Sequence, residues 1–207
     1  MDLFQTNNIY CHRGLWELEE EQNTVQSFLR AKENFFSIET DLRIHDGKIT
    51  VSHDVILDGI FPTFESLKDL KLSAALNLKE DGLFILNEFN RDFLEISNSF
   101  VFDGSIPEMF KYNLLGFPHA LRISEFEKEL PWEPQYVWLD SFTSDWWLED
   151  DTLAQLSDSG NIIVVSPELH GREPRFVWDK MWTLASDGNP NLGICTDLPL
   201  QFLNGMQ

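Results

Sequence analysis

The chain has 207 residues, of which 43% are hydrophobic and 13% aromatic, and this supplies enough apolar material for one substantial core. We therefore expect a single domain over residues 1–207. Its 15 Lys and Arg against 35 Asp and Glu give a formal net charge of -20, and a field of this sign repels polyanions. Nucleic acid is thus not an expected partner, because its non-specific binding needs clustered cations. The excess of acidic residues, taken alone, needs no explanation beyond keeping the protein in solution.

Neither a membrane span nor a secreted scaffold is expected. No stretch approaches the ~18 consecutive apolar residues of a transmembrane helix. The N-terminus reads MDLFQTNNIY and lacks a basic region followed by an apolar run, so we expect a cytoplasmic protein. The two cysteines, Cys11 and Cys195, are too few for a disulfide framework and wrongly spaced for zinc, so we expect both to be reduced and structural.

Short β-rich apolar runs alternate with helical patterns along the whole chain, which is typical of βαβ units and a parallel sheet. The predicted strands are 8–12, 37–44, 74–79, 100–102, 119–123, 136–142, 161–166 and 192–196. The helices expected between them are 24–34, 64–70, 107–115, 151–157 and 175–185. Eight such units favour a short (β/α)8 TIM barrel, with a doubly wound open sheet as the competing architecture.

Two segments depart from this alternation. Residues 45–48 carry an Asp-Gly turn signal and apolar residues alternate after them, so a hairpin arm should follow the second strand and fold over a mouth of the barrel. Residues 124–133 are too few and too polar for a full fifth helix, which predicts a reduced connection. Closure of the barrel would make the first and last strands neighbours and bring Cys11 close to Cys195.

Ionisable residues fall where the strands of a barrel carry catalytic groups, at their C-terminal ends. In the second strand Glu39 and Asp41 lie two positions apart, so their side chains point to the same face. The flanking Ile38 and Leu42 indicate a strand buried on both sides, and buried acids without a partner are costly. A divalent cation such as Mg²⁺ or Ca²⁺ would satisfy both carboxylates. The alternative is a solvated strand face.

Two histidines stand near the predicted mouth of the barrel. His12 ends the first strand and His53 closes the hairpin arm. Such a pair suits a reaction in which one proton is taken and one is given near neutral pH. For His45, His119 and His170 we expect core or surface positions, although His170 lies in the run 167–172 that directly follows the seventh predicted strand.

Several short motifs occur in a fixed order along the chain. They are His12-Arg13-Gly14, Gln22-Asn23-Thr24, Ser27-Phe28, Glu39-Thr40-Asp41, Asp46-Gly47 and Ser52-His53-Asp54, followed near the end by Thr196-Asp197-Leu198-Pro199. In order and spacing they resemble the signature of the glycerophosphodiester phosphodiesterase family, whose fold is a TIM barrel. The resemblance covers the first quarter of the chain and the last strand. The middle of the chain resembles the family only in its alternation of strands and helices.

The resemblance implies metal-dependent cleavage of a small phosphodiester, either a glycerophosphodiester or a lipid headgroup. It implies that His12 is the general base and His53 the general acid. The attacking group would be water or an adjacent hydroxyl of the substrate. The phosphate-binding cations implied are Arg13 and Lys79, and the implied ligands of Mg²⁺ or Ca²⁺ are Glu39, Asp41 and Asn77.

One position departs from the family pattern. Asn77 stands where the family usually has a glutamate, which keeps an oxygen donor but lowers the charge of the ligand set. Shifting the frame would bring Glu80 or Asp81 to this position, against the inward alternation of the strand. A barrel that binds a phosphorylated ligand or regulates a partner without turnover is therefore an alternative function. A lyase that uses its metal to stabilise an enolate is another.

Aromatic and charged residues in the second half of the chain are candidates for substrate contacts. For the tryptophans the alternative is core packing or loop anchoring. The candidates are Trp138 to Phe142 with Asp140, Trp146, Trp147, Glu168, His170 and Arg172. The last three have no counterpart in the family pattern and would define a substrate of their own.

Overall fold

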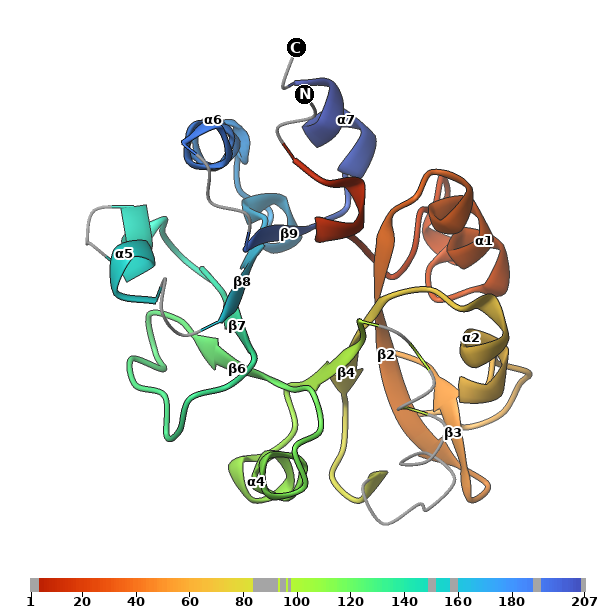
Figure 1. Ribbon diagram of the computed structural model, residues 1–207. Helices are drawn as coiled ribbons and strands as arrows, with labels where there is room; N and C mark the ends of the chain where they lie inside the picture. The colour runs from red at the N-terminus through yellow and green to blue at the C-terminus, as the bar shows by residue number, and fades with distance from the viewer. Residues whose placement is uncertain are drawn as a thin grey trace.

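A computed structural model describes residues 4–83, 93, 96, 98–148, 152–156, 160–187 and 191–205. Its parallel strands form a ring, and the helices surround that ring (Figure 1). The strands of the wall are β1 (Ile9–His12), β2 (Ser37–His45), β4 (Ala74–Leu78), β5 (Phe100–Phe102), β6 (Ala120–Ile123), β7 (Tyr136–Leu139), β8 (Asn161–Val165) and β9 (Leu192–Thr196). They coincide with the eight predicted strands to within three residues at each end.

The strands follow one another around the wall in the order β5-β4-β2-β1-β9-β8-β7-β6. First and last strands are neighbours, because β1 pairs with β9 and sets Tyr10 opposite Cys195. At the remaining seam β5 meets β6 through one parallel bridge between Val101 and His119, where the Val101 N–H donates to the Pro118 carbonyl at 3.2 Å. The predicted (β/α)8 barrel is thus confirmed as a nearly closed one.

Alternate residues of the strands face the inside of the barrel or the helices, as the strand period requires. The side chains that fill the inside are Tyr10, Ala75, Phe100, Phe102, Ala120, Trp138, Ile163, Val165 and Cys195. A larger cluster packs between the outer face of the sheet and the helices, and Cys11 belongs to it. The two cysteines therefore lie on adjacent strands but face opposite sides of the sheet, and both are buried and free.

Each predicted helix is confirmed, with ends that differ from the prediction by at most one residue. The helices are α1 (Val25–Glu33), α2 (Phe64–Leu70), α4 (Ile106–Leu114), α5 (Thr152–Leu156), α6 (Arg175–Ser186) and α7 (Pro199–Asn204). Of these α7 was not predicted, because it is a single short stretch that begins at a proline. Residues 151 and 157 of the predicted fourth connection lie outside the described residues. In the described part of the chain, no helix has the length and apolar character needed to cross a membrane.

The predicted hairpin arm is present. Strand β3 (Lys48–Val51) pairs antiparallel with the outer half of β2. The turn residues Asp46 and Gly47 have φ of 50° and 73°, the positive values that a two-residue type I′ turn requires. After β3 the chain returns to the wall, because the Ser52 N–H donates to the carbonyl of Asp41 at 3.0 Å.

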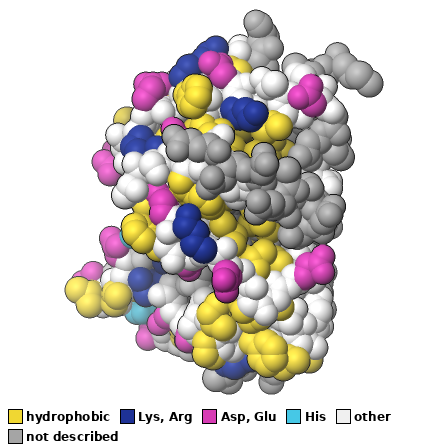
Figure 2. Space-filling model, turned by 90° about the vertical axis from the view of Figure 1, so that its left-hand side faces the viewer, with side chains coloured by type: hydrophobic (Ala, Val, Ile, Leu, Met, Phe, Trp, Pro, Cys, Tyr) yellow, Lys and Arg dark blue, Asp and Glu magenta, His cyan; other side chains and the backbone are white. Residues whose placement is uncertain are grey.

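The predicted reduction of the fifth connection is also confirmed. Residues 124–135, between β6 and β7, form no helix. The Ser124 hydroxyl instead accepts from the N–H groups of Phe126 and Glu127, both at 3.2 Å, and turns the chain locally. Figure 2 views the side of the molecule that carries this segment and α5, where acidic side chains are scattered among hydrophobic groups.

Candidate functional site

The predicted carboxylates and their neighbours meet on three adjacent strands. Glu39 and Asp41 share the inward face of β2 and are 2% and 1% exposed. The register with β1 sets His12 opposite Glu39, and the register with β4 sets Asn77 opposite Asp41. These four predicted site residues are therefore direct neighbours at the carboxyl ends of the strands.

His12 is held by an aspartate from the other end of the chain. Its Nδ1 lies 2.7 Å from Oδ1 of Asp197, which follows β9 directly. A carboxylate at this distance accepts the Nδ1 proton, so Nε2 of the neutral ring is the acceptor, and it lies 4.0 Å from Glu39 Oε2. Burial lowers the pKa of His12, but the hydrogen bond to Asp197 and the charge of Glu39 outweigh burial and raise it. The ring is thus oriented and is a stronger base than a free histidine.

Glu39 is a buried acid with few cationic neighbours. The closest donor is the N–H of Arg13, at 3.3 Å from Oε2. Burial and the charge of Asp41 raise the pKa of Glu39 to about 7. Among the described residues, only His12 lies within ion-pair distance of its carboxylate. The ionised form of Glu39 would therefore be stabilised by an additional cation close to its carboxylate.

Asp41 gathers both predicted phosphate-binding cations. Lys79 Nζ lies 3.0 Å from Oδ1, and Arg13 Nε lies 3.3 Å from Oδ2. Asn23 adds a hydrogen bond from Nδ2 to Oδ2 at 2.8 Å. Burial raises the pKa of Asp41, but Lys79 and the bond from Asn23 outweigh it, so the pKa lies below its ordinary value. Asp41 is thus ionised, and its ion pairs keep the side chains of Arg13 and Lys79 at the mouth of the barrel.

Asn77 brings an unsatisfied oxygen to the same place. The residue is 7% exposed, and its Oδ1 is buried without a hydrogen-bond partner among the described residues. Carboxylate and amide oxygens are the donors that Mg²⁺ and Ca²⁺ prefer, so Glu39, Asp41 and Asn77 fit such a cation in their chemistry. Within the described ranges, no three His, Cys, Asp or Glu side chains are grouped to hold a metal ion. A cation here would therefore depend on the Asn77 oxygen.

The two acids considered as substitutes for Asn77 are engaged elsewhere. Glu80 Oε1 accepts from the N–H of Ile44 at 2.5 Å. Asp81 Oδ1 accepts at 3.1 Å from the N–H of Ser105, the N-cap residue of α4. Among the described residues, neither carboxylate is paired with a residue of the candidate site.

The loop after β1 explains the spacing of the first motifs. Arg13 has a φ of 58° and Gly14 of 88°, and this turn aims the Arg13 N–H at Glu39. A Cβ on Gly14 would lie 2.4 Å from the Ser27 hydroxyl, which itself donates to the Arg13 carbonyl at 3.3 Å. Gln22 Oε1 accepts from Arg13 Nη1 at 3.0 Å. The separated motif residues therefore hold one loop in place.

His53 is the predicted site residue that stands apart. Its side chain is 43% exposed, and Nδ1 lies 2.9 Å from Oδ1 of the exposed Asp54. Its carbonyl accepts from Arg43 Nε at 3.1 Å. Within the described residues, His53 forms no hydrogen bond or ion pair with the other predicted site residues.

The opposite wall of the mouth carries ionisable residues, of which Asp140 and His170 were predicted as candidate substrate contacts, whereas Asp103 and Arg122 were not predicted. Arg122 of β6 donates from Nε to Asp103 Oδ1 at 3.1 Å. Burial raises the pKa of Asp103 despite the charge of Arg122. Arg122 Nη1 also lies 4.0 Å from Asp140 Oδ2, and His170 Nε2 lies 2.7 Å from Asp140 Oδ1. Together with the first wall, these residues complete a charged ring around the barrel mouth.

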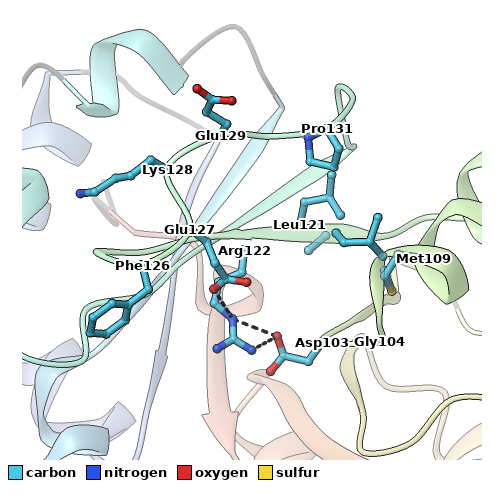
Figure 3. Close-up of a pocket in the computed structure, with 12 residues that line it drawn as sticks. Asp103, Gly104, Met109, Leu121, Arg122, Phe126, Glu127, Lys128, Glu129 and Pro131 are labelled. Atoms are coloured by element: carbon cyan, nitrogen blue, oxygen red, sulfur yellow. Dashed lines mark hydrogen bonds and ion pairs between the residues drawn. The ribbon is translucent and has the colours of Figure 1, made fainter.

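A cavity of about 550 Å³ opens beside Arg122. Figure 3 shows Arg122 pointing toward Asp103 and Glu127 at one end of it, with Leu121 and Met109 along the side. The cavity lies between α4 and the segment after β6, where the fifth connection forms no helix. The reduced connection thus leaves room next to the mouth.

Two of the candidate substrate contacts, Glu168 and Arg172, form hydrogen bonds within the protein. Glu168 accepts from the hydroxyls of Ser166 and Thr196 and from the Asp197 N–H, the last at 3.2 Å. Arg172 donates to Asp145 Oδ1 at 2.5 Å and to the Ser141 carbonyl at 2.7 Å. Glu168 therefore holds the segment that carries Asp197.

Compared with known proteins, the chain matches no family model and no curated protein at a significant level. The missed residues Asp103, Arg122 and Asp197 share one signal. Each is an ionisable residue at or just after the end of a predicted strand, where barrels carry catalytic groups. Asp197 also stood in the last of the ordered motifs.

Proposed function

We propose that the protein hydrolyses a small phosphodiester, in a reaction of the glycerophosphodiester phosphodiesterase type that its motifs resemble. The observation that carries the proposal is the oriented His12–Asp197 pair beside Glu39, next to the two cations on Asp41. A base, phosphate-binding cations and oxygen donors for a metal are the groups that such a reaction needs.

Arg13 and Lys79 are the proposed phosphate-binding groups. Both already lie within 3.3 Å of Asp41, so their ends are side by side. Displacement at phosphorus builds up negative charge on the phosphoryl oxygens, and fixed cations stabilise that charge in the transition state. A guanidinium binds two oxygens at once, whereas an ammonium acts as a point charge.

Glu39, Asp41 and Asn77 are the proposed ligands of a Mg²⁺ or Ca²⁺ ion. The raised pKa of Glu39 and the unsatisfied oxygen of Asn77 support this choice. When bound, the ion supplies neutralisation of the charge that develops on phosphate oxygens. Without the ion, the carboxylates of Glu39 and Asp41 balance the charges of Arg13 and Lys79. An added anionic substrate would then leave negative charge in excess.

His12 is the proposed general base. Asp197 binds Nδ1, so Nε2 takes the proton of the attacking water or substrate hydroxyl. The leaving oxygen needs a proton in return, and the resemblance assigns that task to His53. The substrate class proposed is a glycerophosphodiester or the headgroup phosphodiester of a lipid.

A second candidate function is binding of a phosphorylated ligand without turnover. Asn77 favours it, because two carboxylates and an amide hold a divalent cation less tightly than three carboxylates. The two functions differ in whether any phosphodiester bond is broken.

The test measures release of p-nitrophenol from bis(p-nitrophenyl) phosphate and cleavage of a panel of glycerophosphodiesters. We expect activity with Mg²⁺ or Ca²⁺, loss on chelation, and loss of at least ~100-fold in His12→Ala, in line with the usual contribution of a general base. His45→Ala is the matched control, because His45 lies on the hairpin arm and its side chain pairs, among the described residues, only with Asp46. Activity that survives in His12→Ala would refute the scheme. Metal and ligand binding without any turnover would favour the second function.

A further inference from the structure

A second histidine–aspartate pair lies on the opposite wall of the barrel mouth. Asp140 follows β7 and is 5% exposed. It continues the alternation of Tyr136 and Trp138, which both contribute to the cluster inside the barrel, so its carboxylate points inward. Oδ1 accepts from the N–H of Ser141 at 2.8 Å. Asp140 is therefore a buried carboxylate that is held in position.

His170 stands on the short 3-10 helix η5 (Pro167–His170) directly after β8. Its Nε2 lies 2.7 Å from Asp140 Oδ1, and its ring centroid lies 4.9 Å from that of Phe142. The carboxylate of Asp140 accepts a hydrogen bond from the Nε2–H group of His170. The other ring nitrogen, Nδ1, has no hydrogen-bond partner among the described residues. The pair thus has the same construction as His12 with Asp197, with one ring nitrogen held and the other open.

The two pairs share one rigid frame. Glu168, two residues before His170 in η5, accepts from the N–H of Asp197 at 3.2 Å and from the Thr196 hydroxyl. Asp197 in turn holds His12 at 2.7 Å. A short run of hydrogen bonds from His12 to Glu168, together with the backbone of η5 from Glu168 to His170, therefore connects both histidines along the same rim of the mouth. By contrast, His53 is 43% exposed on the arm and its partner Asp54 is 92% exposed.

An acid that acts in the transition state must be held close to the leaving oxygen. We propose that His170, positioned by Asp140, is the general acid that protonates the leaving group, in place of His53. This rests on the proposed phosphodiesterase function. His12 and His170 then work from two sides of the mouth, one on the nucleophile and the other on the leaving group.

With water as the nucleophile, one proton is lost to His12 and one is gained from His170. Water gives a proton to His12 Nε2 while its oxygen forms a bond to phosphorus. The bond between phosphorus and the leaving oxygen breaks, and its electron pair stays on that oxygen. The Nδ1 proton of protonated His170 passes to the leaving oxygen, which departs as an alcohol. His170 is left neutral with Nε2–H on Asp140, and exchange with solvent resets both histidines.

The surroundings of Asp140 leave space for a departing alcohol. Arg122 Nη1 lies 4.0 Å from Asp140 Oδ2, and Arg122 lines the cavity of about 550 Å³ seen in Figure 3. The cavity is also lined by Leu121 and Met109. The leaving group would thus extend from His170 toward this cavity.

The test compares two esters of glycerol phosphate that differ only in the leaving group, ethanol or p-nitrophenol. Ethoxide needs a proton to leave, whereas p-nitrophenolate leaves without one. We expect His170→Gln to lower kcat/KM for the ethyl ester by about 100-fold or more, the usual contribution of a general acid, and for the p-nitrophenyl ester by less than about 10-fold. Asp140→Asn should give a smaller loss with the same selectivity, which a merely structural role would not produce.

His45→Gln is the matched control, because His45 lies on the hairpin arm outside the site, and we expect it to leave both kcat/KM values unchanged. His53→Gln tests the rival acid, and we expect it to show no selective loss on the ethyl ester. Equal thermal melting of the variants and wild type checks that they fold. Equal losses on both esters in folded His170→Gln, or a selective loss in His53→Gln alone, would overturn the proposal while the proposed function stands. A wild-type protein that cleaves neither ester would overturn both.

Discussion

Replacing Asn77 by leucine should stabilise the metal-free protein. The side chain is 7% exposed, and its Oδ1 is buried with no hydrogen-bond partner among the described residues. A buried polar group left unsatisfied costs about 1–3 kcal/mol. Leucine has the same branching at Cγ, so it fits this position on β4 without the polar oxygen.

The expected gain is therefore about 1–3 kcal/mol in the free energy of unfolding, measured by urea denaturation in the presence of a chelator. In thermal unfolding each kcal/mol corresponds to a rise in Tm of about 2–4 °C for a domain of this size. The same substitution removes an oxygen donor facing Asp41. Titration calorimetry should accordingly find weaker binding of Mg²⁺ or Ca²⁺.

Asn77→Asp is the matched comparison, because it places a third carboxylate opposite Asp41 in the register of β2 and β4. It should be less stable than wild type with chelator, through repulsion from Asp41 and Glu39, and should bind Ca²⁺ more tightly. A leucine variant that is less stable than wild type with chelator would show that the amide oxygen is satisfied. Unchanged metal affinity would remove Asn77 from the ligand set.

Three further outcomes are expected. Asp197→Asn should lower kcat/KM by about 10- to 100-fold, since a charge-assisted hydrogen bond to His12 contributes about 1.5–3 kcal/mol, and an unchanged kcat/KM would exclude Asp197 as the positioning group. In urea unfolding Gly14→Ala should cost more than Gly47→Ala, because both have positive φ but only at Gly14 would the Cβ also meet a neighbour, at 2.4 Å; equal costs would contradict this. Burial lowers the pKa of His119 below its ordinary 6.5, so the unfolded chain binds the extra proton first. Its contribution to stability should be complete above pH 6.5 and decline as the pH falls, by at most about 1.4 kcal/mol per pH unit. Unfolding of wild type and His119→Gln at pH 7.5 and 5.5 should reveal this difference, and equal pH dependence would refute it.

Local sequence patterns were sufficient to predict the strands and helices of the barrel and the residues of one wall of the site. The period of two in β2 put Glu39 and Asp41 on one face, and both prove buried there. The Asp46-Gly47 turn could be predicted because positive φ at both central residues is a property of those two residue types. Neighbouring parallel strands then placed His12 and Asn77 beside the carboxylates.

The opposite wall and the pairings across it depend on the tertiary structure. His12 and Asp197 are 185 positions apart, and His170 and Asp140 are 30 apart. A strand's own sequence determines which residues face inward, but closure of the barrel determines which inward residues meet. The register of β1 and β9 sets Tyr10 rather than Cys11 opposite Cys195, so the two cysteines face opposite sides of the sheet. The 3-10 helix η5 places His170 beside Asp140. Side-chain alternation along a strand is a local property, whereas register and closure are set by packing of the whole core.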